Sequence, residues 1–292
     1  MNNKKIGVGF SNLAIFFYHT FLCDKKIVKA LLIFAIAGLI ITSSGCMGPE
    51  SEVEEIKSGV VESQGKIETY KMDADMELIM GANSMAMTIT AKLKSLVDLR
   101  NHKMKTDMDM TMSMMGSSKM EIYLIEDTLY RDMDMKNEWT QTKLDELKKE
   151  EMWNERNQIK KEFEMFEKSE LELSGSEEIR GTDCWVIKVK PDTKALKEYV
   201  QSGLSQSSTD LNDAELPDME FKNVTIKYWI SKDDHFIKKE ANEIEFTMIV
   251  TSGKDVQSID MKMKTIIEIY DYNLPVEINL PGAAANARIE NF

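Results

Sequence analysis

The sequence is poor in cysteine and histidine, the residues that most often supply nucleophiles and soft metal ligands. It holds 3 cysteines and 3 histidines in 292 residues. Outside the N-terminal leader these are Cys46, Cys184, His102 and His235, and both histidines stand in polar, turn-like contexts. Cys46 stands directly at the end of the leader, so Cys184 is the single cysteine of the expected folded body and no internal disulfide is expected there. No nucleophile–base pair is visible. We therefore expect a buried, unreactive thiol at Cys184 and no enzymatic activity.

Basic residues are outnumbered by acidic ones. Lysine and arginine number 37 against 50 aspartates and glutamates, which gives a formal net charge of −13. Nucleic-acid binding and attachment to an anionic membrane by charge alone both need clustered basic residues. The carboxylates are neither paired for acid–base chemistry nor spaced as a calcium loop. We therefore expect no nucleic-acid partner, no cofactor and no carboxylate metal site.

The N-terminus has the order of an export signal. Lysines within 25–29 precede an apolar run at 30–41, and small residues at 43–45 stand directly before Cys46. Gly-Cys at the end of such a leader resembles the lipobox of prokaryotic lipoproteins, which implies cleavage before Cys46 and acylation of its thiol. The apolar run is short for a membrane-spanning helix. An uncleaved membrane anchor is the alternative.

These features predict an exported protein on the outer face of the cytoplasmic membrane of a prokaryote, with the membrane as a partner through acylated Cys46. Residues 1–45 are predicted to be the signal peptide. Residues 1–24 lie upstream of an already complete signal, which indicates either a start codon placed too early or a second hydrophobic segment. Residues 46–66 are polar and acidic and predict a tether that leads into a short helix near Val53–Val60.

The body alternates apolar and polar residues with a period of two over most of its length, which predicts a meander of antiparallel strands. The period becomes helical at 144–170, and a shorter helix is predicted at 194–203. The fold class is therefore α+β. We expect one strongly curved antiparallel sheet, an open half-barrel, covered on its concave face by one long and one short helix.

Four stretches of the body resemble the LolA/LppX–LprG-like lipoproteins. They are "MEIYLIEDTLYRDMDMKNEWTQTK" around Tyr130 and Trp139, "GTDCWVIKVKP", "IKYWISKDDHFIKKEANEI", and "YDYNLPVEINLP" with Tyr272, Asn273, Pro275, Val276, Ile278 and Pro281. Their order spans about residues 67–281. The resemblance implies a single half-barrel domain at 67–281, with a C-terminal tail at 282–292, that holds acyl chains between its concave face and its helices. It brings no catalytic residues.

Methionine is abundant, with 22 in the chain, and many of these residues fall on one face of the expected strands. Methionine side chains are flexible and polarizable, so they can re-pack around fluid apolar ligands. We predict an apolar ligand site, between the sheet and the long helix, formed by Met72, Met76, Met80, Met85, Met87, Met108, Met110, Met112, Met114, Met152, Ile159, Phe163 and Phe166.

The predicted function is to bind a lipid or other apolar molecule as a carrier or chaperone, in a monomeric protein with an unidentified membrane partner. One alternative is a surface-anchored structural or sensory domain without lipid cargo, in which methionine only packs the core. Another is a Cu(I)-binding protein, because Met-x-Met repeats can ligate Cu(I) through their thioethers.

Overall fold

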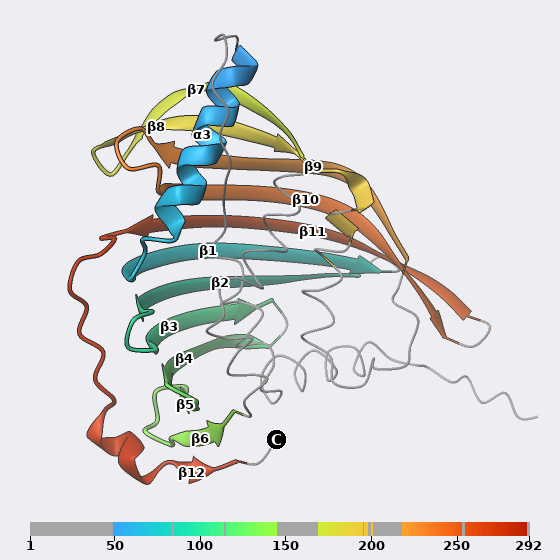
Figure 1. The fold of residues 1–292 in the computed structure, drawn as a ribbon. Coiled ribbons are helices and arrows are strands. Elements are labelled where there is room, and N and C mark those ends of the chain that lie inside the picture. Colours follow the sequence, from blue (N-terminus) through green and yellow to red (C-terminus); the bar gives the residue numbers. More distant parts are fainter. Residues whose placement is uncertain are drawn as a thin grey trace, which may run out of the picture.

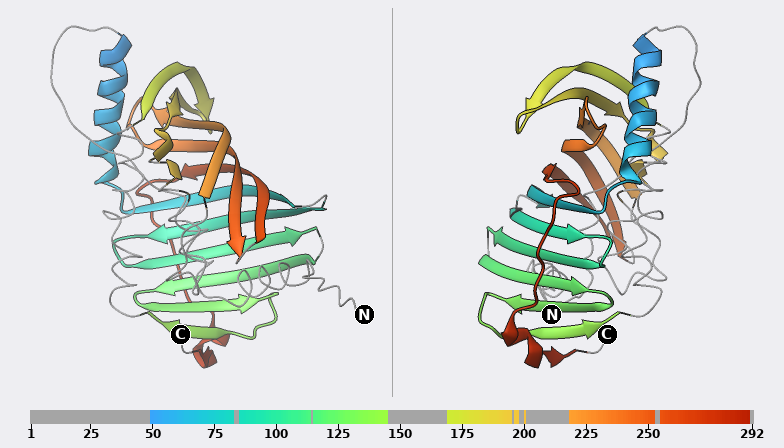
Figure 2. Two further views of the ribbon diagram at one scale, coloured as in Figure 1. Left: turned by 90° about the vertical axis from the view of Figure 1, so that its right-hand side faces the viewer. Right: turned by 60° about the vertical axis from the view of Figure 1, so that its left-hand side comes forward.

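One open sheet of twelve strands makes up most of the described protein (Figure 1). The strand order is β12-β6-β5-β4-β3-β2-β1-β11-β10-β9-β8-β7, and the two edges do not meet. The sheet is strongly curved, as two further views show (Figure 2). The structure is a computed structural model, and it describes residues 49–82, 85–113, 115–144, 169–194, 196–197, 200, 218–252 and 255–290.

Eleven of the twelve strands form two meanders in which each strand pairs with the next along the chain. The first meander contains β1 (Thr69–Ala82), β2 (Met85–Asp98), β3 (Lys103–Met112), β4 (Gly116–Ile125), β5 (Thr128–Met133) and β6 (Thr140–Lys143). The second contains β7 (Glu170–Ile179), β8 (Thr182–Lys190), β9 (Asp218–Ser231), β10 (Ile237–Ser252) and β11 (Asp255–Tyr270). A ladder between β1 and β11 joins the two meanders, and it pairs Lys71 with Tyr270 at one end and Gly81 with Asp260 at the other.

The sheet is mixed, whereas the sequence predicts a purely antiparallel one. The predicted C-terminal tail forms a 3-10 helix, η2 (Gly282–Asn286), and a two-residue strand, β12 (Arg288–Ile289). β12 pairs parallel with β6. The reason is the path of the C-terminal segment, which leaves β11 and runs down the molecule to the far edge of the sheet, as seen in Figure 1.

Each face of the sheet has its own apolar core. We call the face that carries Met72, Ile122 and Ile267 the inner face, because these residues belong to the main core cluster. The opposite, outer face carries a second cluster in which Ile278 and Ala284 of the C-terminal segment pack with Tyr123 and Trp139. Alternation along each strand separates the two sets of side chains, as expected for a pleated strand.

Helix α3 (Pro49–Gln64) belongs to the main core and is longer than the short helix expected near Val53–Val60. Its residues Ile56 and Val60 are buried in that cluster. In Figure 1 the helix stands across β7 to β10. Of the two helices that were expected to cover the sheet, the long one at 144–170 falls mostly on residues 145–168, which lie outside the described residues. Its expected ends are not helical, because Leu144 follows β6 and Glu170 begins β7. The short one is described in part, with helical residues at Thr193, Lys194, Leu196, Lys197 and Val200.

An arginine ties the β7–β8 turn to the centre of the sheet on its outer face. Arg180 donates hydrogen bonds to Glu268 on β11 and Asp73 on β1, each at 2.9 Å. Its guanidinium lies 3.9 Å from the ring centroid of Tyr270. Gly181 follows with a φ of 80°, a left-handed conformation that glycine adopts without strain. These contacts link the far end of the second meander to the junction with the first.

Candidate ligand-binding face

Methionines line much of the inner face of five neighbouring strands. We call this surface the methionine face. It consists of Met72, Met76, Met80, Met87, Met104, Met108, Met110, Met112, Met120, Met261 and Met263. Most of these side chains are buried, and Met76 and Met263 are half-buried. They come from β1, β2, β3, β4 and β11, which are adjacent in the sheet.

Strand register makes the methionine face continuous. Met80 lies opposite Met87 on one side and Met261 on the other. Met108 lies opposite Met120. Directly opposed side chains in antiparallel strands have Cβ atoms roughly 4.5–5.5 Å apart. Methionine side chains of neighbouring strands therefore lie side by side at these points, and inner-face positions between them carry other apolar residues, such as Leu78, Ile89 and Ala91.

The residues predicted for the ligand site are described only in part. Met72, Met76, Met80, Met87, Met108, Met110 and Met112 all lie on the inner face. Met85 begins β2, but its side chain is not described. Cys46, Met114, Met152, Ile159, Phe163 and Phe166 lie outside the described residues. The structure therefore brings together the sheet half of the predicted site.

Four polar residues interrupt the apolar inner face on β9, β10 and β11, and none of them is among the residues predicted for the ligand site. We call Tyr228, Glu240, Asn242 and Thr265 the polar cluster. The exposed fractions of Glu240, Asn242 and Thr265 are 7%, 5% and 1%. Asn242 lies opposite Thr265, and Glu240 lies opposite Tyr228. The buried polar groups thus occupy adjoining positions.

Hydrogen bonds inside the polar cluster converge on Glu240. The Asn242 side-chain amide donates to Glu240 Oε1 at 2.5 Å, and the Tyr228 hydroxyl donates to the same oxygen at 3.5 Å. Burial raises the pKa of Glu240 to about 7, and the two hydrogen bonds oppose that rise. The carboxyl group is therefore close to its titration midpoint at neutral pH.

The sequence did contain a signal for this cluster. Glu240 and Asn242 fall at the same parity as Ile244 and Phe246, which are apolar and buried. A period of two places all four on one face of a strand. The surrounding stretch "IKKEANEIEF" is rich in charged residues. Glu240 and Asn242 therefore do not stand out as polar residues on the apolar face.

A cavity of about 290 Å³ lies next to the inner face where β8 ends and β9 begins. Its lining includes the apolar residues Phe221, Val224 and Leu196 and two lysines, Lys190 and Lys222. Both lysines already form ion pairs, Lys190 with Glu170 at 2.9 Å and Lys222 with Asp260 at 2.6 Å. The size is at the lower limit for a small-molecule pocket.

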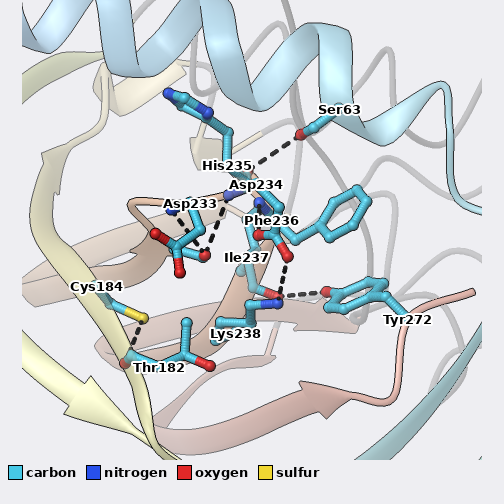
Figure 3. Close-up of polar contacts among 11 residues, drawn as sticks. Ser63, Thr182, Cys184, Asp233, Asp234, His235, Phe236, Ile237, Lys238 and Tyr272 are labelled. Atoms are coloured by element: carbon cyan, nitrogen blue, oxygen red, sulfur yellow. Dashed lines mark hydrogen bonds and ion pairs between the residues drawn. The ribbon is translucent and has the colours of Figure 1, made fainter.

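Helix α3 is attached to the sheet at the β9–β10 turn (Figure 3). Ser63 Oγ donates to the backbone carbonyl of His235 at 3.1 Å. A Cβ added at Gly59 would lie 2.2 Å from Cδ2 of the His235 ring, so the helix approaches the turn closely because residue 59 is glycine. The His235 ring also packs on Trp185, with centroids 5.4 Å apart. The Tyr272 hydroxyl donates to the carbonyl of Ile237 and ties the C-terminal segment to the same turn.

Cys184 is a free, fully buried thiol, as the sequence predicts. It packs with Val186 and Trp229 on the outer face of the sheet. Its sulfur contacts the carbonyl oxygen of Thr182 at 3.4 Å, as drawn in Figure 3. Burial raises the pKa of the thiol to about 11, which keeps it protonated at neutral pH.

No helix within the described residues has the length and apolar character to cross a membrane. In the same part of the chain, no three histidine, cysteine, aspartate or glutamate side chains converge on a common point.

Comparisons with known proteins give low identities over most of the chain. No curated protein matches it. The chain is similar to the lipoprotein LppX of Mycobacterium tuberculosis, with 12% identity and a TM-score of 0.43 over 80% of this chain and 100% of that one. It is also similar to LprF of Mycobacterium bovis, with 10% identity and a TM-score of 0.41 over 81% of this chain and 99% of that one. A LolA superfamily protein of Nitrosomonas europaea has 9% identity and a TM-score of 0.23 over 81% of this chain and 96% of that one.

The chain is thus similar to LolA/LppX–LprG-like proteins, as four stretches of its sequence predict. One family model also matches residues 52–288, from within α3 to the first residue of β12. The chain therefore belongs to the family described as "Family of unknown function (DUF6612)".

Proposed function

We propose that this protein binds a lipid or another apolar molecule on the methionine face and acts as an exported, lipid-anchored carrier or chaperone without enzymatic activity. The observation that carries this proposal is the continuity of the methionine face across five adjacent strands. A packed core of fixed shape is better served by branched side chains with defined rotamers. A surface of opposed thioethers suits a ligand whose chains are fluid.

Burial of hydrocarbon supplies the binding energy in this proposal. Each methylene group removed from water contributes roughly 0.8 kcal/mol, so a partly enclosed acyl chain binds usefully without a charged anchor. Methionine has three rotatable bonds and a polarizable sulfur, and it therefore re-packs around ligands of different shape at little cost. Specific recognition of a head group is not required for affinity.

We infer that the ligand lies between the methionine face and a helical cover. The segment at 144–170 supplies one apolar stripe, Met152, Ile159, Phe163 and Phe166, and the segment at 194–203 supplies the second helix. Two observations support a covering helix at 194–203. Leu196 and Val200 are helical, and both are buried in the main core.

The leader supports the export part of the proposal. Signal cleavage before Cys46 and acylation of its thiol would hold the domain on the outer face of the cytoplasmic membrane. We propose a monomer that exchanges its ligand with that membrane, or with a membrane partner.

One observation favours a second candidate, a structural or sensory domain without cargo. Most side chains of the methionine face are buried. A plain core would look the same, since methionine is a tolerated core filler. The two candidates differ in whether an apolar molecule copurifies with the protein.

Mass spectrometry of bound molecules separates the two. The full chain is extracted into amphipol, and the organic extract is compared with that of Met110→Gln. This substitution keeps the length of the side chain but places an amide on the methionine face. We expect an apolar molecule near one per protein in the parent, and roughly tenfold less in the variant, because the amide is desolvated without a partner.

Thr111→Gln is the matched control, because Thr111 is the exposed neighbour on the same strand. It should carry the same load as the parent, and lipids held by the amphipol are common to all samples. Equal loads in Met110→Gln and Thr111→Gln would overturn the proposal. A parent that carries no apolar molecule above background would favour the domain without cargo.

A further inference from the structure

We propose that the polar cluster recognises a neutral hydroxyl group on the apolar ligand. The inference rests on the proposed function and names the chemical class of ligand: a hydrocarbon chain that carries an alcohol. The motivating observation is a pair of buried hydrogen-bonding atoms, Asn242 Oδ1 and Thr265 Oγ1, that have no partner among the described residues.

The two unpartnered atoms lie on neighbouring strands. Asn242 on β10 and Thr265 on β11 are directly opposed in the ladder, and both side chains are on the inner face. The Asn242 amide nitrogen is already occupied by Glu240, which leaves its oxygen as an acceptor. The threonine hydroxyl can both donate and accept. A buried polar group without a partner is costly, so such a pair is expected to have one when the protein is at work.

An alcohol fits both atoms. Its proton can be donated to Asn242 Oδ1 while its oxygen accepts from the Thr265 hydroxyl. A carboxylate has no proton to offer Asn242, and a carboxylate or phosphate adds negative charge beside Glu240. An ammonium group can donate to both atoms but cannot accept the threonine proton, and it loses far more hydration on burial. The geometry therefore favours the neutral hydroxyl.

The cluster borders the methionine face, so one ligand can contact both. Thr265 lies opposite Met76 on β1. Along β11 the next inner-face residues are Met263 and Met261. A ligand hydroxyl held at Thr265 places its hydrocarbon chain over the methionines. The polar cluster then fixes the position of the ligand, and the methionines supply most of the affinity.

Competition with a neutral fluorescent probe tests the assignment. The full chain in amphipol is loaded with N-phenyl-1-naphthylamine, and the probe is displaced by dodecanol, dodecane, dodecylamine or dodecanoate. We expect dodecanol to displace the probe at about tenfold lower concentration than dodecane, because it adds two hydrogen bonds. Dodecylamine and dodecanoate should be weaker than dodecanol.

Two nearly isosteric variants locate the effect. Thr265→Val and Asn242→Leu should each abolish the preference for dodecanol over dodecane. Thr265→Ser keeps the hydroxyl and should keep the preference. Thr106→Val is the matched control, because Thr106 is buried on the same inner face but its hydroxyl already bonds that of Ser95 at 2.8 Å.

Thermal melting adds a readout that does not depend on ligand. Thr265→Val removes an unpartnered group, so the Tm should stay the same or rise. Thr106→Val leaves Ser95 without its partner, so the Tm should fall. The opposite pattern would show that Thr265 is satisfied within the fold, and it would overturn the assignment.

Four further outcomes of the displacement assay would each contradict the proposal in a different way. A dodecanol preference that persists in both Thr265→Val and Asn242→Leu overturns the site. Equal displacement by dodecanol and dodecane in the parent overturns hydroxyl recognition but leaves apolar binding intact. A trapped water would then be the partner of Asn242 Oδ1 and Thr265 Oγ1. Stronger displacement by dodecylamine shows an amine site instead. Failure of the probe to bind removes the proposed function, and this inference with it.

Discussion

At the scale of single residues, Glu240 has the clearest consequence for stability. Its carboxyl group is buried, and its cross-strand neighbours are Tyr228 and Ile267, neither of which is a cation. Burial raises the pKa from the usual 4.5 to about 7. Between these two values the folded state holds a proton that the unfolded state has lost, so the free energy of unfolding falls as the pH rises through that window.

Glu240→Gln should remove this pH dependence. The glutamine oxygen still accepts from Asn242, but the side chain carries no charge at any pH. We expect the variant to match the parent near pH 4.5 and to be more stable by roughly 3 kcal/mol at pH 8, since each pKa unit corresponds to about 1.4 kcal/mol. Urea denaturation of both proteins at several pH values measures the difference.

Glu220→Gln is the control for loss of a carboxylate, because Glu220 is exposed on β9. It should not reproduce the effect. If the difference between Glu240→Gln and the parent is constant from pH 4.5 to 8, the carboxyl of Glu240 does not titrate in that range.

At the scale of elements, the packing of helix α3 on the β9–β10 turn depends on a single glycine, Gly59. In an open helix, alanine is preferred to glycine by up to about 1 kcal/mol. At Gly59 the new methyl group would meet the His235 ring, so Gly59→Ala should instead destabilise the protein by about 1–3 kcal/mol, the usual cost of overpacking. Denaturant titration of the variant and the parent gives the value.

The same substitution in a His235→Ala background is the decisive comparison. Removal of the ring opens the space, so Gly59→Ala should become neutral or stabilising there. A coupling of this kind between two residues is what a double-mutant cycle measures. Equal effects of Gly59→Ala in both backgrounds would show that the helix does not rest on the His235 ring.

Strand β3 allows thioether chemistry to be separated from apolar character. Met108, Met110 and Met112 are all buried on the inner face. Changing all three to leucine keeps the surface apolar at a cost under about 1.5 kcal/mol each. We expect binding of N-phenyl-1-naphthylamine to persist, measured by fluorescence. Tight Cu(I) binding by the parent that is lost in the triple variant would instead support the copper hypothesis.

The strands could be predicted where their pattern is local. In β1 and β3 methionine alternates with charged or polar residues, and in β2 and β4 apolar residues in general alternate with polar ones. This alternation gives the strand, its two faces and the neighbours in a meander. The polar cluster could not be predicted from a local pattern, because the importance of Asn242 depends on its pairing with Thr265, more than twenty residues later in the chain. β12 has two residues and no pattern at all. Its parallel pairing with β6 follows from the path of the C-terminal segment, which no local pattern encodes.

At the scale of the whole molecule, attachment to the membrane is proposed to depend on Cys46. Cys46→Ala removes the thiol that accepts the acyl group, so the protein should be left with its leader uncleaved or its N-terminus unlipidated. Intact mass and partitioning into detergent measure both. Cys184→Ala is the control, because that thiol is buried in the sheet. An unchanged processed mass in Cys46→Ala would refute lipidation at this residue.

The order of the strands has a consequence for how the protein is made. Within each meander, every strand pairs with its neighbour in the chain, so hairpins can form as the chain lengthens. The β1–β11 ladder is different, because it joins Lys71 to Tyr270. Closing a loop of this length is slow, and contacts distant in sequence retard folding. The two halves of the sheet are therefore expected to stay separate, each partly built, until β11 has been synthesised and pairs with β1.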